Sequence, residues 1–128
     1  MSHCGTPRVA LVVEDEWLLR DVIAEAFRGA GWHVLEASTA EEAIDFLEAG
    51  AAVDIVFTDI QLAGRLSGWD VGERCRGLWK DVPVIYASGN ARDRSRKVRD
   101  SLFFDKPYEA SAVMERADEL CQTGRRDV

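Results

Sequence analysis

Short apolar runs rich in β-branched residues alternate along this chain with segments of helical periodicity. The runs lie at about residues 8–13, 32–37, 53–59, 84–87 and 102–104. Runs of this length and composition are typical of strands buried on both faces of a sheet. Their alternation with helical segments predicts an α/β fold, a doubly wound, five-stranded parallel sheet with helices on both faces. At 128 residues we expect one domain over residues 1–128, with its core at about 8–122 and no attached output domain.

The segments after these runs predict five helices, at about residues 16–30, 39–50, 68–78, 91–100 and from 108 onward. In the first, the residues expected to face the sheet recur at intervals of three and four: Leu19, Val22, Ile23, Ala26 and Ala30. Thr39 and Glu42 form the capping-box pattern that begins a helix. The segment 91–100 has only two apolar residues, so we expect its helix, capped by Asn90, to be short and loosely held.

Charged and hydroxyl side chains follow the carboxyl ends of four predicted strands. They are Glu14 and Asp15 after the first strand, Asp59 after the third, Ser88 after the fourth and Lys106 after the fifth. Open α/β sheets bind ligands at this edge, so we expect these side chains to gather there. Aspartate is a poor strand residue and costly to bury, so Asp59 is expected to be exposed at its strand end. The alternative is that Asp59 only begins a turn.

Carboxylates that meet at one edge repel one another unless a cation lies among them. Magnesium prefers oxygen ligands and uses only one or two carboxylates, and Mn²⁺ can substitute for it in such a site. We expect Asp15 and Asp59 to supply the carboxylates and the backbone carbonyl of Gln61 a third ligand, while Glu14 holds a bound water. The alternative for the Glu14–Asp15 pair is a cap on the first helix, where negative charge is favourable.

The ammonium of Lys106 and the hydroxyl of Ser88 are suitable partners for phosphoryl oxygens. Together with a metal among the carboxylates, they indicate a site for phosphoryl transfer. Taken alone, Lys106 is also consistent with a solvated surface lysine and Ser88 with a turn residue.

Four motifs stand in order at the strand ends: Glu14-Asp15, Phe57-Thr58-Asp59, Ala87-Ser88-Gly89 and Asp105-Lys106-Pro107. With these motifs the chain, from about residue 8 to 120, resembles the receiver domains of two-component response regulators. The resemblance implies a flavodoxin-like sheet with strand order 2-1-3-4-5. It also implies a phosphoprotein switch that is not a conventional enzyme, although it catalyses its own phosphorylation and dephosphorylation.

The resemblance assigns roles to individual residues. Asp59 is the expected acceptor of a phosphoryl group from a sensor histidine kinase or a histidine phosphotransfer protein. Lys106 pairs with that group, Ser88 turns toward it, and Phe103 changes rotamer with Ser88. The signal then passes by contact with a downstream protein or by phosphorelay, and we expect a monomer or a weak homodimer.

The sequence departs from the usual pattern of the family at four positions, one of which is Ser88, where threonine is more frequent. Ala63 stands where a proline is common, and Gly68 comes one residue late, so the loop after Asp59 is one residue longer. Phe103 replaces the more common tyrosine. In similar proteins the bond between Lys106 and the following proline is cis.

Two rival functions belong to other classes. A small magnesium-dependent aspartyl phosphatase usually carries a second aspartate two residues after its nucleophile, where this chain has Gln61. A phosphorylation-independent interaction module of receiver shape would not take up phosphate. The basic residues within 92–99 are interpreted as a solvated helix face, with a surface for an acidic partner as the alternative.

Composition excludes several other classes. A net charge of −7 opposes non-specific nucleic-acid binding, and no apolar run has the length of a membrane span. The amino end lacks a secretory signal pattern, so we expect a cytoplasmic protein. Cys4, Cys75 and Cys121 are odd in number and far apart, which favours reduced thiols over disulfides or a zinc site.

Overall fold

The computed structural model describes residues 7–124, which form one five-stranded sheet and four helices. The strands are β1 (Val9–Val13), β2 (His33–Ala37), β3 (Ile55–Asp59), β4 (Val84–Ser88) and β5 (Ser101–Asp105). The helices are α1 (Trp17–Gly29), α2 (Ala40–Glu48), α3 (Gly68–Leu78) and α4 (Ala110–Gly124). All neighbouring strands pair in parallel, in the order β2-β1-β3-β4-β5. The predicted fold class and strand order are therefore confirmed.

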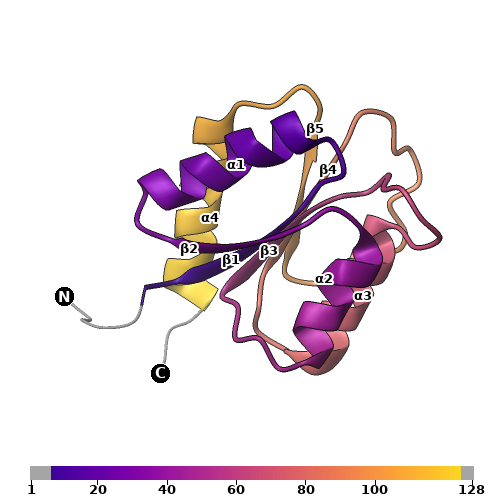
Figure 1. Ribbon diagram of the computed structural model, residues 1–128, viewed down its shortest axis with the longest axis horizontal. Helices are drawn as coiled ribbons and strands as arrows, with labels where there is room; N and C mark the ends of the chain where they lie inside the picture. Colours follow the sequence, from indigo (N-terminus) through magenta and orange to yellow (C-terminus); the bar gives the residue numbers. More distant parts are fainter. Residues whose placement is uncertain (1–6, 125–128) are drawn as a thin grey trace.

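Helices cover both faces of the sheet, as the alternating pattern predicted. Figure 1 shows α1 and α4 on one face and α2 and α3 on the other. Each face has its own apolar core, because successive side chains of a strand point to opposite sides. In the central strands β3 and β4 every residue is buried, which explains their continuous apolar runs. No helix among the described residues has the length and apolar content that crossing a bilayer requires.

The buried face of α1 differs from the predicted one. Its buried residues are Ile23, Ala24 and Phe27, whereas Val22 is 49% exposed. Phe27 determines this rotation because its ring meets the edge of Trp32 at 5.1 Å between centroids and lies in the core under α1. Ile23 is buried as predicted, and Leu19 and Ala26 are half-buried, but Val22 and Ala30 are exposed, so the predicted face was correct only in part.

The helix predicted at 91–100 is wrong, because this segment has no regular secondary structure. It lies against α3, where Arg96 forms ion pairs with Asp70 at 3.0 Å and Glu73 at 2.8 Å. Asn90 begins no helix, and its N–H donates to Ser88 Oγ at 3.3 Å. With so few apolar residues a helix would bury little, and ion pairs to α3 are compatible with an irregular backbone.

Candidate functional site

Three carboxylates meet at the carboxyl ends of β1 and β3. One oxygen each of Glu14, Asp15 and Asp59 lies within 4.8 Å of the other two. Glu14 is 2% exposed and Asp59 4%, whereas Asp15 is exposed. The prediction that Asp59 is exposed is therefore wrong. Solvent reaches the cluster on the side of Asp15.

Lys106 provides positive charge next to this cluster. Its Nζ lies 3.3 Å from Asp59 Oδ1 and 3.4 Å from Glu14 Oε1. The three side chains share the face of the sheet under α1 and α4, because Val12 and Phe57, two residues before each carboxylate, lie in that core. The peptide bond between Lys106 and the following proline is cis, as the resemblance implied.

The pKa values in the cluster reflect burial and an excess of negative charge. Burial, and then the charge of Asp59, raises the pKa of Glu14 to about 7. Burial also raises the pKa of Asp59, although Lys106 acts in the opposite direction. Burial lowers the pKa of Lys106, but the charges of Asp59 and Glu14 outweigh it and raise that pKa overall. One ammonium does not neutralise three carboxylates at this spacing.

The donor set of the cluster fits a hard divalent cation. Magnesium takes oxygen ligands and keeps several waters, so a cluster with one solvent-exposed carboxylate suits it. A cation there would offset the repulsion among the carboxylates, which adds to burial in raising the pKa of Glu14. Gln61 is exposed, and its side-chain amide donates to Asn90 Oδ1 at 3.0 Å. The role of its backbone carbonyl as a ligand stays a prediction.

The long loop after Asp59 is held by carboxylates from two other elements. Asp15 Oδ2 accepts from the N–H of Ala63 at 3.1 Å, and Glu41 Oε2 accepts from the N–H of Arg65 at 3.2 Å. Sequence patterns gave no sign of Glu41, because nothing near it in the chain indicates that it contacts this loop. The loop is thus held at Ala63, the position where the family commonly has proline.

Gly68 closes this loop by close approach to β3. A Cβ at Gly68 would lie 2.0 Å from the carbonyl oxygen of Asp59, and the N–H of Gly68 donates to the oxygen of Ile60 at 2.8 Å. Only glycine allows the start of α3 to lie this near the backbone of Asp59. The one-residue shift of this glycine in the sequence is therefore accommodated within the loop.

Ser88 and Phe103 lie on the other face of the sheet, on neighbouring strands. Ser88 is 1% exposed and follows Ala87, the register partner of Asp59. Phe103 pairs in register with Tyr86, and their ring centroids are 6.4 Å apart. The guanidinium carbon of Arg94 lies 3.7 Å from the centroid of the Phe103 ring. Phe103 is half-buried in this position, and its role as a switch stays a prediction.

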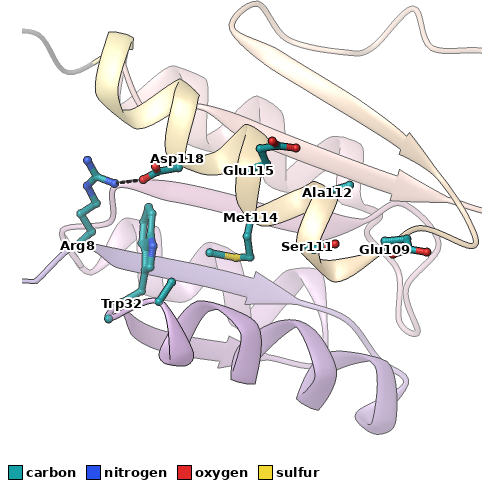
Figure 2. A pocket seen from close by; sticks show the side chains of 10 residues that line it. Arg8, Trp32, Glu109, Ser111, Ala112, Met114, Glu115 and Asp118 are labelled. Carbon is teal, nitrogen blue, oxygen red and sulfur yellow. Dashed lines mark hydrogen bonds and ion pairs between the residues drawn. The ribbon is translucent and has the colours of Figure 1, made fainter.

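A separate groove on the α1 and α4 face is lined by a mixture of charged, aromatic and small residues. Figure 2 shows Arg8 and Trp32 on one side of it and residues of α4 on the other, with Arg8 paired to Asp118 at 2.9 Å. Arg8 precedes β1, whereas Glu14 follows it, so this wall lies at the opposite end of the strand from the carboxylates. The three clustered carboxylates and Lys106 thus lie apart from this wall, at the carboxyl ends of the strands.

Comparison with known proteins identifies the class to which this fold and site belong. The family model of the response regulator receiver domain matches residues 10–118. The chain therefore belongs to the response regulator receiver domain family. This confirms the resemblance inferred from the four strand-end motifs.

Solved structures and a curated protein show the same relationship. A response regulator receiver protein from Sinorhizobium medicae WSM419 aligns with a TM-score of 0.89 and 29% identity, over 93% of this chain and 98% of that one. TrrA of Thermotoga maritima, a response regulator solved in complex with Mg²⁺ and BeF, aligns with a TM-score of 0.78 and 25% identity, over 88% and 98%. The transcriptional regulatory protein PdtaR of Mycobacterium tuberculosis is 26% identical over 88% of this chain. The chain spans 12% to 56% of the length of the curated relatives that it matches.

Proposed function

We propose that this receiver domain accepts a phosphoryl group on Asp59 in a magnesium-dependent reaction and signals through the resulting change of shape. The observation that carries the proposal is the position of Asp59. Its carboxylate is buried, lies 3.3 Å from the Lys106 ammonium and belongs to a cluster of three carboxylates. In the related TrrA, a complex with Mg²⁺ and BeF has been solved.

The proposed donor is the phosphohistidine of a sensor histidine kinase or of a histidine phosphotransfer protein. An oxygen of the Asp59 carboxylate attacks phosphorus, the P–N bond breaks, and the imidazole nitrogen takes up a proton. Magnesium held by Asp15, Asp59 and the Gln61 carbonyl, with Glu14 holding a metal-bound water, would neutralise charge on the phosphoryl oxygens. Mn²⁺ would serve in the same way.

Residues of the chain itself then stabilise the product. Lys106 forms a charge-assisted hydrogen bond with a phosphoryl oxygen. Ser88 turns toward the new group, and Phe103 moves into the space that Ser88 leaves. The resulting surface binds a downstream protein, or Asp59 passes the phosphoryl group to another histidine.

Intact mass after incubation with acetyl phosphate tests this proposal. With magnesium we expect the wild-type protein to gain one phosphoryl group, and Asp59→Asn or removal of the metal to abolish the gain. Asp105→Asn is a matched control, because Asp105 also ends a strand but its side chain is 75% exposed. A folded protein that gains no mass would favour the phosphorylation-independent module. Turnover of a general phosphomonoester would favour the aspartyl phosphatase.

A further inference from the structure

Tyr108 places a buried hydroxyl in the core on the face of the sheet that carries the carboxylate cluster. Its ring meets Phe57 at 5.8 Å and Phe104 at 6.4 Å between centroids, both in edge-to-face geometry. Phe57 is two residues before Asp59 and Phe104 two residues before Lys106, so each pair shares a face of the sheet. All three rings belong to the core under α1 and α4. Tyr108 therefore packs in the core on the side of the sheet that carries the Asp59–Lys106 pair.

The hydroxyl of Tyr108 has no hydrogen-bond partner among the described residues, although it is buried. Most buried hydroxyls in proteins do have a partner, so this one requires an explanation. Burial, and then the charges of Glu14 and Asp59, raises the pKa of Tyr108. The hydroxyl therefore stays protonated, as a donor, within electrostatic reach of two buried carboxylates.

The carboxylate of Glu14 shares its charged partner, Lys106, with the proposed phosphoryl acceptor. Its Oε2 accepts from the backbone N–H of Glu16 at 3.1 Å, and its Oε1 shares the Lys106 ammonium with Asp59. A phosphoryl group on Asp59 attracts that ammonium, since it carries more charge than the carboxylate it replaces. A buried carboxylate that loses a charged partner is strongly destabilised unless another donor takes its place.

We propose that Tyr108 is a positioning residue whose hydroxyl donates a hydrogen bond to the Glu14 carboxylate when phosphorylation of Asp59 pulls Lys106 away. The inference rests on the proposed function and adds a residue that the four motifs do not contain. In the unphosphorylated protein the hydroxyl donates no hydrogen bond to the described residues. In the phosphorylated protein it compensates Glu14 and so stabilises that state.

Calorimetric titration with beryllofluoride, which stands in for the phosphoryl group on a carboxylate, tests the inference. Tyr108→Phe removes the hydroxyl and keeps the ring. At saturating magnesium we expect this variant to bind beryllofluoride about tenfold more weakly than the wild type, because it loses one hydrogen bond to a charged group. Its affinity for magnesium alone should stay within about twofold, because Lys106 still pairs with Glu14 in that state. Its melting temperature should not fall, since the lost hydroxyl had no partner among the described residues.

Two further variants make the result specific. Tyr86→Phe is the matched control, because the Tyr86 hydroxyl accepts from the N–H of Val98 on the other face of the sheet. We expect it to bind beryllofluoride like the wild type. In a Glu14→Gln background, the effect of Tyr108→Phe should fall below about twofold, because the charged acceptor is gone.

Several outcomes would overturn the inference. One is unchanged beryllofluoride affinity in Tyr108→Phe, and another is an equal loss of affinity for magnesium alone, which indicates a structural defect. A loss of similar size in Tyr86→Phe, or one that persists in the Glu14→Gln background, would also overturn it. A wild-type protein that binds magnesium but no beryllofluoride would overturn the proposed function together with the inference.

Discussion

At the scale of single residues, the glycine that begins α3 determines where the proposed acceptor lies. The position of Gly68 leaves no room for a Cβ, because the nearest atoms would be the carbonyl oxygen of Asp59 at 2.0 Å and its carbon at 2.9 Å. Both are backbone atoms, which cannot move aside as a flexible side chain can. Gly77, in the same helix, has no heavy atom within 4 Å of such a Cβ.

Gly68→Ala should therefore destabilise the protein by about 2 kcal/mol or more, since α3 or β3 must shift. It should also slow phosphorylation of Asp59, whose backbone is what the new methyl group meets. Gly77→Ala is the matched control and should be neutral or stabilise by up to about 1 kcal/mol, the helix-propensity difference. Urea denaturation of both variants gives the comparison. A Gly68→Ala protein as stable as Gly77→Ala would contradict the close approach.

Glu14 makes the stability of the metal-free protein depend on pH. Its pKa is about 7 in the folded protein and near 4.5 when unfolded, so the folded state binds more protons between these values. The unfolding free energy should therefore lose a contribution from this residue as pH rises from 4.5 to about 7. At 1.36 kcal/mol per pKa unit, the interval from 4.5 to about 7 corresponds to a loss on the order of 3 kcal/mol.

Glu14→Gln should remove that contribution, so in EDTA its unfolding free energy should exceed that of the wild type by a margin that grows between pH 4.5 and pH 7. Comparison with the wild type at each pH cancels the other carboxylates. Glu16→Gln, at the exposed neighbouring glutamate, controls for the change of net charge. A difference between Glu14→Gln and the wild type that is constant over this pH range would rule out a raised pKa at Glu14.

At the scale of elements, Arg76 of α3 joins the end of that helix to the irregular segment before β5. The guanidinium of Arg76 donates hydrogen bonds to two groups of backbone carbonyls. One group, Trp79 and Lys80, directly follows α3, and the other, Arg99 and Asp100, directly precedes β5. In a helix these carbonyl oxygens would accept hydrogen bonds from backbone N–H groups, whereas here the side chain of Arg76 supplies the donors. This contact joins the end of α3 to the residue before β5.

Arg76→Ala should lower the unfolding free energy by about 1 to 2 kcal/mol and speed amide exchange at the start of β5, because several carbonyls lose their charged donor. Arg74→Ala is the matched control in the same helix. Arg74 pairs only with Glu48 among the described residues, with both side chains about half exposed. Such a pair contributes at most about 1 kcal/mol. Equal effects of the two variants would mean that Arg76 is an ordinary surface arginine.

At the scale of the whole molecule, metal binding at the carboxylate cluster should raise global stability. A ligand that binds only the folded state at ten times its Kd stabilises by about 1.4 kcal/mol, which corresponds to a rise in Tm of about 3 to 5 °C for a domain of this size. Scanning calorimetry in MgCl₂, against NaCl of equal ionic strength, measures this rise. Asp15→Asn and Asp59→Asn should each reduce it. The same Tm in both salts would mean that the cluster does not bind magnesium specifically.

Local sequence patterns predicted the architecture of the molecule well. The apolar runs predicted all five strands, and the strand-end positions of Glu14, Asp15, Asp59 and Lys106 predicted that these side chains meet, as they do. These predictions succeed because strand periodicity is local and a parallel sheet places all its carboxyl ends at one edge.

The inward face of α1, the irregular segment at 91–100 and the burial of Asp59 were not predictable in this way. The irregular backbone at 91–100 depends on residues far away in the chain, the α3 carboxylates that bind Arg96. The inward face of α1 depends on how the ring of Trp32 packs beside Phe27, and the burial of Asp59 on the side chains of distant strand ends that surround it. Local propensity is a weak guide where tertiary contacts contribute more free energy than the propensity itself.

The sequence by itself determined which elements form and which charged groups reach the same edge of the sheet, because both follow from short-range pattern and from the topology of parallel strands. Only the tertiary structure decided how deeply Asp59 is buried, how its loop is held, and that the buried hydroxyl of Tyr108 has no hydrogen-bond partner among the described residues. Burial and hydrogen bonding are properties of packed surfaces from distant parts of the chain, and no local pattern specifies them.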